Sequence, residues 1–440
     1  MESTIISNQK ALVVAVNMGY GHQRTAYPLI DLSFERKIIN ANDYQGIPEK
    51  DRKIWESARK FYESISRLKR IPIIGNLIFE VLIDRFQKIR VFYPKRDLSK
   101  PNSQLKQIAA LIKGGWGRDL ITKLSGLTPE PLPLISTFFT PAFMAEFFNY
   151  PGEIFCVVCD ADISRTWAPL NPQQSKIKYF APTERVVERL KLYGVKPTNI
   201  FLTGYPLPLE NIGTEKMEIL KQDLAQRIVN LDPKEKYRQK YGYLIKHNLG
   251  ELPKKSDHPL TITFAVGGAG AQKEIAIKIV KSLSQKIKNA EIKMILVAGT
   301  KEWIRDYFRQ KIKKLSLENK LNKNIEIIFG QNIEDYFSKF NRLLRKTDIL
   351  WTKPSELSFY TALGLPIIIA PTIGSQENFN REWLLKLGSG IPQENPRYTD
   401  QWLFDLLESG WFAEAAMQGF IEGEKLSALK IKKIIEQLTK

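Results

Sequence analysis

The strongest constraint on the fold is a pattern that occurs twice: a short apolar strand, a glycine-rich turn and then a helix. The first copy begins with the apolar run KALVVAV at 10–16, and the turn NMGYGH leads into a helix over 23–32. The second begins at Leu260, where LTITFAV precedes the turn GGAGA and another helix. Such apolar runs are typical of strands buried on both faces of a parallel sheet. Two such openings, each followed by alternating strands and helices, predict two doubly wound α/β domains.

The histidine that follows the first glycine turn is the leading candidate for a catalytic side chain. His22 comes directly after Gly19-Tyr20-Gly21, at the carboxyl edge of the first strand, where ligands bind in open α/β sheets. A neutral imidazole at such an edge can accept a hydroxyl proton near pH 7. The turn lacks the third glycine of a dinucleotide fingerprint, which argues against a nicotinamide or flavin cofactor.

Residues 351–390 contain, in order, a turn, a helix, a strand, a second turn and a second helix. Ser355 is a suitable N-cap for the first helix, and Gly364, with a proline two residues later, predicts where that helix ends. The apolar run at 366–370 is typical of a buried parallel strand. The turn at 374–378 opens the second helix, whose free N–H groups and dipole suit a diphosphate.

This stretch resembles the nucleotide-sugar half of GT-B glycosyltransferases. Its motifs are most similar to those of monogalactosyldiacylglycerol synthases and of the peptidoglycan N-acetylglucosaminyltransferases that form lipid II. The first glycine turn also resembles the acceptor-side turn of these enzymes, because His22 and Ala26 match their Gly-x-Gly-His-x-x-x-Ala pattern. The matching motifs of the second half are KPSELS at 353–358, GLP at 364–366, GSQENFN at 374–380 and GSG at 388–390.

The resemblance implies a GT-B fold, in which two doubly wound Rossmann-like domains face each other across a cleft. It covers most of residues 10–40 and 130–410. The implied division is an acceptor-side domain at 1–210 with a basic amphipathic insertion at about 41–124, a helical linker at 211–258, a nucleotide-sugar domain at 259–410, and a C-terminal helix at 411–440 that crosses back to the first domain.

The same resemblance assigns roles to individual residues. His22 would be the catalytic base, and Asp160 would orient it or bind the acceptor. Gly19, Gly21, Arg165 and Trp167 would lie on the acceptor side, although Arg165 and Asp162 would also fit an ordinary surface ion pair. The residues implied in donor binding are Gly267, Gly268, Gly270, Gly330, Ile333, Lys353, Ser355, Glu356, Ser375, Gln376, Glu377 and Asn380.

One position departs from the family pattern. The acidic residue that holds the ribose hydroxyls in these enzymes corresponds to Phe359 here, and Glu356, one turn earlier, is the candidate replacement. No metal and no cofactor beyond the UDP-sugar co-substrate is implied, because no Asp-x-Asp pair lies in a phosphate turn. The pair Asp160 and Asp162 has that spacing but falls in the acceptor half.

Positive charge is concentrated in one part of the chain. The net charge is +19, and residues 50–123 alone carry 18 Lys and Arg against 7 Asp and Glu. No nucleic-acid-binding motif accompanies this charge. Residues 54–89 predict two amphipathic helices broken at Ile71-Pro72, with Trp55 and other aromatic residues beside Lys and Arg, a pattern that suits an anionic membrane surface. The alternative is that the apolar stripe packs on the first sheet and the charges are solvated.

The only two cysteines, Cys156 and Cys159, lie in a predicted buried strand, where residues three apart point to opposite faces. We interpret them as structural thiols, because a zinc or redox site needs a turn or a second pair of ligands.

These observations predict an enzyme that transfers a hexose or N-acetylhexosamine, with inversion, from a UDP-sugar to a hydroxyl acceptor, with a lipid as the leading candidate. The N-terminus lacks the features of a signal peptide and the apolar run at 71–83 is too short to span a bilayer. We therefore expect a cytoplasmic protein, either soluble or peripheral on the inner face of the membrane. Two alternatives stay open, a UDP-sugar 2-epimerase on the same fold and a non-catalytic UDP-sugar-binding or membrane-associated protein.

Overall fold

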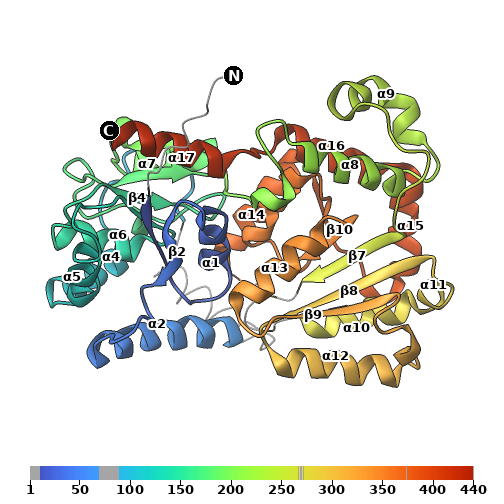
Figure 1. Cartoon of the computed structure of the whole chain (residues 1–440), viewed down its shortest axis with the longest axis horizontal. Helices are drawn as coiled ribbons and strands as arrows, with labels where there is room; N and C mark the ends of the chain where they lie inside the picture. The colour runs from blue at the N-terminus through green and yellow to red at the C-terminus, as the bar shows by residue number, and fades with distance from the viewer. Residues whose placement is uncertain are drawn as a thin grey trace. The chain divides into compact units, whose positions relative to one another are not determined.

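The computed structural model describes residues 10–68, 89–265, 267, 270, 272–372 and 374–439, without the side chains of residues 61–68 and Ser375. Contacts within the chain divide it into two compact units (Figure 1). The first comprises Met1–Pro206, Ile373–Phe379 and Leu426–Lys440, and the second comprises Leu207–Thr372 and Asn380–Lys425. Each unit contains a six-stranded sheet in which every strand pairing is parallel. The prediction of two doubly wound α/β domains is confirmed.

The sheet of the first unit has the strand order β2-β1-β3-β4-β5-β6. All five residues of β1 are buried, as expected for a central strand covered on both faces. The order reverses between β1 and β3, so this sheet has its topological switch point there. The strands are β1 (Ala11–Ala15), β2 (Ser33–Asn40), β3 (Leu134–Ser136), β4 (Ile154–Val157), β5 (Lys178–Ala181) and β6 (Ile200–Leu202); the helices are α1 (Gly21–Ala26), α2 (Glu49–Leu68), α4 (Ser103–Lys113), α5 (Arg118–Ser125), α6 (Phe139–Phe147), α7 (Glu184–Leu192) and α17 (Ser427–Leu438).

The sheet of the second unit has the strand order β12-β11-β10-β7-β8-β9, and its switch point lies between β7 and β10. The strands are β7 (Leu260–Ala265), β8 (Ile292–Gly299), β9 (Ile325–Phe329), β10 (Ile349–Thr352), β11 (Ile367–Ile369) and β12 (Gly390–Pro392). The helices are α8 (Glu218–Leu231), α9 (Lys236–Leu249), α10 (Lys273–Ser282), α11 (Ser284–Lys288), α12 (Glu302–Lys314), α13 (Ile333–Leu344), α15 (Thr399–Ser409) and α16 (Trp411–Glu422), together with α14 (Ser375–Leu387), whose first turn is grouped with the first unit.

The observed division differs from the predicted one in two places. The region 211–258 is not a separate linker, because its helices α8 and α9 contact each other and α16 and belong to the second unit. The end of the chain does not cross back as one piece either. Helix α16 stays with the second unit, and only the part from Leu426 onward, which contains α17, belongs to the first (Figure 1). The hydroxyl of Ser427 donates a hydrogen bond to the Gly204 carbonyl at 2.8 Å, which anchors the start of α17 within the first unit.

The segment after β10 differs from its prediction in helix type and in its cap. Residues Glu356–Leu363 form a 3-10 helix, and the Ser355 side chain makes no capping hydrogen bond. Every residue from Leu357 to Leu363 is buried, so packing on all sides, including against α16, decides the local conformation. The predicted end is confirmed, because Gly364 terminates the helix with a φ of +66°.

Helix α2 covers the first of the two predicted amphipathic helices, and the second falls mostly within residues 69–88, outside the described part of the chain. Trp55 of α2 is buried with its ring edge-on to Trp116 at 4.7 Å between centroids. At this position the apolar stripe therefore packs on the protein itself. Within the residues that the structure describes, no helix combines the length and the apolar content needed to cross a membrane.

Candidate active site

His22 lies at the switch point of the first sheet, in the first turn of α1, directly after the loop that follows β1. Its Nδ1 atom is 2.8 Å from the main-chain carbonyl oxygen of Thr137, which follows β3. The Thr137 hydroxyl donates a hydrogen bond in return to the His22 carbonyl at 2.9 Å. This reciprocal pair of contacts fixes the ring between the carboxyl ends of the two strands that flank the switch point.

The contact at Nδ1 also determines the tautomer of His22. A carbonyl oxygen can only accept a hydrogen bond, so Nδ1 carries the proton and the lone pair of the neutral ring lies on Nε2. An imidazole held in this way presents Nε2 as a general base. The group that orients the ring at Nδ1 is thus a main-chain carbonyl.

The surroundings of the imidazole are mainly aromatic. The rings of Phe138 and Trp167 lie 4.6 and 6.4 Å from the His22 ring, and the Cys159 sulfur is 3.5 Å from Nδ1. His22, Phe138, Asp160 and Trp167 line one cavity of about 760 Å³, which we call the His22 cavity. The structure therefore brings together four of the predicted site residues, His22, Asp160, Trp167 and Gln376.

The two predicted glycines of the first turn lie beside this histidine. Gly19 is exposed with a φ of +112°, a conformation that favours glycine, and Gly21 begins α1. Together they turn the chain from β1 into α1, and the imidazole follows at the second position of the helix.

Arg165 does not form the surface ion pair with Asp162. It is buried, and its guanidinium donates to the carbonyls of Ser99, Ala168 and Pro169. Asp162 is also buried and pairs with Arg189, whose Nη2 lies 2.7 Å from a carboxylate oxygen. Because main-chain carbonyls hold the guanidinium of Arg165, this residue braces the wall of the site.

In the second unit, Gly267 and Lys353 meet at the switch point between β7 and β10. A Cβ atom placed on Gly267 would lie only 2.7 Å from Cε of Lys353, so the lysine side chain passes directly over this glycine. The Gly270 N–H donates to the Gly267 carbonyl at 2.7 Å and closes a tight turn, and Gly268 lies outside the described residues. A lysine beside a glycine turn after a central parallel strand is a combination that suits a diphosphate.

The other predicted donor residues fall into two groups. Asn380 is fully buried and its Nδ2 donates to the Pro354 carbonyl at 3.3 Å, and Glu377 is buried as well. Asn380 thus supports the turn that carries Lys353. Ser355, Glu356 and Gln376 are partly exposed, and Ser375 begins α14.

Phe359, at the position where the related enzymes have an acid, is buried and packs against the Trp383 ring at 4.9 Å between centroids. This packing explains why a carboxylate is not accommodated there.

Gly330 contacts the main chain of Tyr336 so closely that a Cβ would lie 2.5 Å from it, and Ile333 begins α13. The turn after β9 is therefore tight and leaves Ile333 partly exposed.

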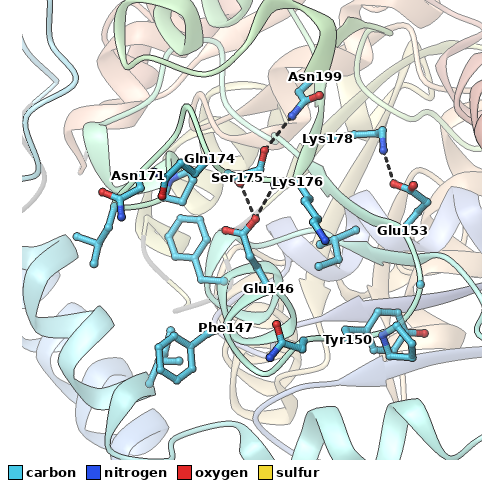
Figure 2. Close-up of a pocket in the computed structure, with 18 of the residues that line it drawn as sticks. Glu146, Phe147, Tyr150, Glu153, Asn171, Gln174, Ser175, Lys176, Lys178 and Asn199 are labelled. Carbon is cyan, nitrogen blue, oxygen red and sulfur yellow. Dashed lines mark hydrogen bonds and ion pairs between the residues drawn. The ribbon is translucent and has the colours of Figure 1, made fainter.

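A cavity larger than the His22 cavity, of about 1540 Å³, lies elsewhere in the first unit (Figure 2). It opens at the amino ends of β3, β4 and β5, the edge of the sheet opposite to His22. Figure 2 shows that two of its carboxylates have partners: Glu146 accepts from Ser175 and from the Lys176 N–H, and Glu153 pairs with Lys178. We assign no ligand to this cavity.

Sequence reasoning missed two parts of the His22 site. The carbonyl of Thr137 has no side-chain signature, and only its place after an apolar strand could have pointed to it. The proximity of the Cys159 sulfur to His22 was also missed, because Cys159 was predicted within a buried strand, whereas β4 ends at Val157.

Comparisons with known proteins agree with this arrangement. Residues 253–391 match a family model described as "Domain of unknown function (DUF6938)". The chain is 24% identical over 397 residues to a processive diacylglycerol beta-glucosyltransferase of Bacillus pumilus, a match that covers 88% of this chain and 83% of the relative. The Bacillus subtilis protein of the same name is 22% identical, with the same coverage. Among solved structures, Acinetobacter baumannii MurG aligns over 97% of this chain and 99% of its own, with 12% identity and a TM-score of 0.48. By its sequence, over 88% of its length, the chain is similar to diacylglycerol glucosyltransferases.

Proposed function

We propose that this protein transfers a hexose or an N-acetylhexosamine from a UDP-sugar to a hydroxyl group of a lipid. The observation that carries the proposal is His22, whose Nδ1 is held by the Thr137 carbonyl beside a mainly apolar cavity. The relatives over 88% of the chain are named as diacylglycerol beta-glucosyltransferases, which supports both the reaction and a glycerolipid acceptor. Glucose is therefore the first sugar to test.

In the proposed reaction the acceptor hydroxyl attacks the anomeric carbon of the donor sugar. His22 Nε2 takes the hydroxyl proton as the new carbon–oxygen bond forms, and the bond to the diphosphate breaks with its electron pair leaving on UDP. A single displacement of this kind inverts the anomeric configuration. Asp160, which lines the same cavity, would interact with the acceptor.

On the donor side, we propose that the turn at Gly267 and Gly270 and the Lys353 ammonium group stabilise the diphosphate as its charge develops. Their meeting at the switch point of the second sheet supports this assignment. Glu356 is proposed to bind the ribose hydroxyls in place of the family's acidic residue, and Gly330 and Ile333 to hold the uracil.

We further propose that the protein works at an anionic membrane surface on the cytoplasmic side. Every basic side chain that the structure describes between residues 50 and 123 is exposed, which supports this placement. Binding to anionic vesicles should then weaken as salt rises, because the attraction falls off within a Debye length.

The test measures UDP release and radiolabelled lipid from UDP-glucose, UDP-galactose and UDP-N-acetylglucosamine, with and without diacylglycerol in vesicles. The proposal predicts labelled glycolipid and UDP release that depends on the lipid. Conversion of the UDP-sugar without lipid would instead favour the 2-epimerase. A rise in melting temperature with UDP, but no turnover across a panel of lipid acceptors, would favour the non-catalytic protein.

A further inference from the structure

The His22 cavity continues as a groove between helices α2 and α4. Each helix contributes one stripe of residues at helical spacing. Ile54 and Ala58 of α2 face the groove on one side, and Ile108 and Leu111 of α4 face it on the other. The aromatic residues around His22 complete it, so the groove is a long apolar channel that leads to the proposed base.

The cationic groups of the groove lie in exposed positions on α2, and each has a partner. Lys50 donates to the Gly114 carbonyl at 3.1 Å, and Lys53 pairs with Glu49 at 2.6 Å. The carboxyl group of Asp160 is the acidic group that lines the cavity. The lining of the cavity thus carries two ammonium groups against one carboxylate, and its apolar walls rather than its charges select the occupant, a hydrocarbon chain.

A polar atom without a partner lies in the wall of this apolar channel. The indole nitrogen of Trp116 is buried and has no hydrogen-bond partner among the described residues. The main chain beside it is anchored, because the neighbouring Gly117 N–H donates to the Asp51 carboxylate at 3.0 Å. An unpaired buried N–H is costly, so a ligand that supplies an uncharged acceptor would be favoured at this position.

We propose that the groove between α2 and α4 binds a fatty acyl chain of an ester-linked neutral lipid, and that the Trp116 indole N–H donates a hydrogen bond to one ester carbonyl. The inference rests on the proposed function and specifies its acceptor. The apolar stripes would hold the hydrocarbon, and the indole would distinguish an acyl ester from an alkyl ether. Because neighbouring side chains cover the nitrogen, a ligand reaches it only as the ring turns, so tryptophan fluorescence should change on binding.

The first experiment compares dibrominated diacylglycerol with the dialkyl ether of the same chain length and bromination, each in phosphatidylcholine vesicles. Bromine quenches nearby tryptophan, and Trp55 and Trp167 also line the cavity, so a titration gives a dissociation constant even without Trp116. The intact protein should bind the ester about fivefold more tightly than the ether, as expected for one added hydrogen bond. Trp116→Phe keeps an aromatic ring but removes the N–H, and should bind both lipids equally.

A second pair of variants tests the groove without touching the indole. Ala58→Trp fills the groove from α2 and should weaken binding of both lipids at least tenfold. Ala110→Trp is the matched control, because Ala110 is exposed on the other side of α4, where it lines the large cavity of Figure 2, and it should bind as the parent does.

Equal affinity of the parent for ester and ether, or an ester preference that survives in Trp116→Phe, would overturn the role of the indole. Unchanged binding in Ala58→Trp would overturn the groove as the acyl site. Ester-selective binding without sugar transfer from any UDP-sugar would leave this inference standing and reject the proposed function. Sugar transfer without ester selectivity would reject the role of the indole and leave the proposed function standing.

Discussion

The Nδ1 atom of His22 and the carbonyl oxygen of Thr137 lie 2.8 Å apart and join the carboxyl ends of β1 and β3. If Nε2 is the base, His22→Ala should lower kcat roughly 10²- to 10⁴-fold. The affinity for UDP should stay within about twofold of the parent, since the proposed donor residues belong to other loops. Steady-state kinetics with diacylglycerol and a calorimetric UDP titration measure the two quantities. Near-normal turnover would remove His22 from the mechanism.

The glycine beneath Lys353 provides a second prediction. Gly267→Ala would place a Cβ 2.7 Å from Cε of Lys353 and push this flexible side chain aside. Losing its contact with the diphosphate should weaken UDP binding about tenfold or more, because hydrogen bonds to charged groups contribute roughly 1.5–3 kcal/mol. The same change at Gly242, in α9, meets no atom within 4 Å and serves as the control for the added methyl group. Equal UDP affinity in both variants would mean that Lys353 does not bind the phosphates.

A buried arginine connects α8 to the segments that precede β10 and β11 in the second unit. The Arg227 guanidinium donates to the carbonyls of Leu344, Thr347, Leu363 and Gly364, and burial lowers the pKa of its side chain. Arg227→Met would leave these carbonyls without their donor. We expect a loss of about 3 kcal/mol or more in the free energy of unfolding, measured by urea denaturation.

The control for this variant is Lys246→Met, which removes an exposed ion pair with Glu251. It should change stability by less than about 0.5 kcal/mol, as is usual for exposed pairs. Similar midpoints for Arg227→Met and the control would show that water or relaxed main chain replaces the lost donors.

Stability should depend on pH through His258, at the amino end of β7. Its ring contacts Asp257 at 2.5 Å and Asp348 at 3.3 Å. Burial opposes the charged form, but the hydrogen bonds and charges of Asp348 and Asp257 outweigh it and raise the pKa of His258 above its usual value of about 6.5. A raised pKa in the folded state means that this stabilisation is complete below about pH 6.5 and is lost as pH rises through the folded pKa.

His258→Gln should therefore cost more stability at pH 6 than at pH 8.5. The measurement is the urea midpoint of the parent and of the variant at both pH values. A loss that is equal at the two pH values would show that the imidazole acts only by packing and neutral hydrogen bonds.

The sequence predicted those parts of the fold whose residues repeat a simple pattern. The apolar runs at 10–16 and 366–370 contain strands β1 and β11, because their apolar residues follow one another without interruption. Strand β2 was not predicted, because Glu35, Arg36 and Lys37 interrupt its apolar residues. Glu35 and Arg36 adopt a left-handed conformation, with φ of +51° and +52°, so the strand is irregular and lies at the edge of its sheet.

The site was predictable where a side chain itself carries the chemistry, as with His22. It was not predictable where the chemistry depends on the main chain or on packing. Main-chain carbonyls hold both His22 and Arg165. Every residue type has such a carbonyl, so the sequence cannot indicate which ones make these contacts. Asn380 is an opposite case. Its side chain is polar and belongs to a recognisable motif, but it is fully buried beneath a turn.

Helix α17 has a consequence for how the first unit is completed during synthesis. Roughly 220 residues separate Pro206 from Leu426, and the second unit is made almost entirely within that interval. At about 5–20 residues per second, the ribosome needs roughly 10 to 45 s to produce them. Ile431 and Ile435 are fully buried in the finished protein, so until they emerge the nascent first unit exposes the apolar surface that they will cover. Newly made chains would therefore depend on chaperones for longest in the half of the protein that is translated first.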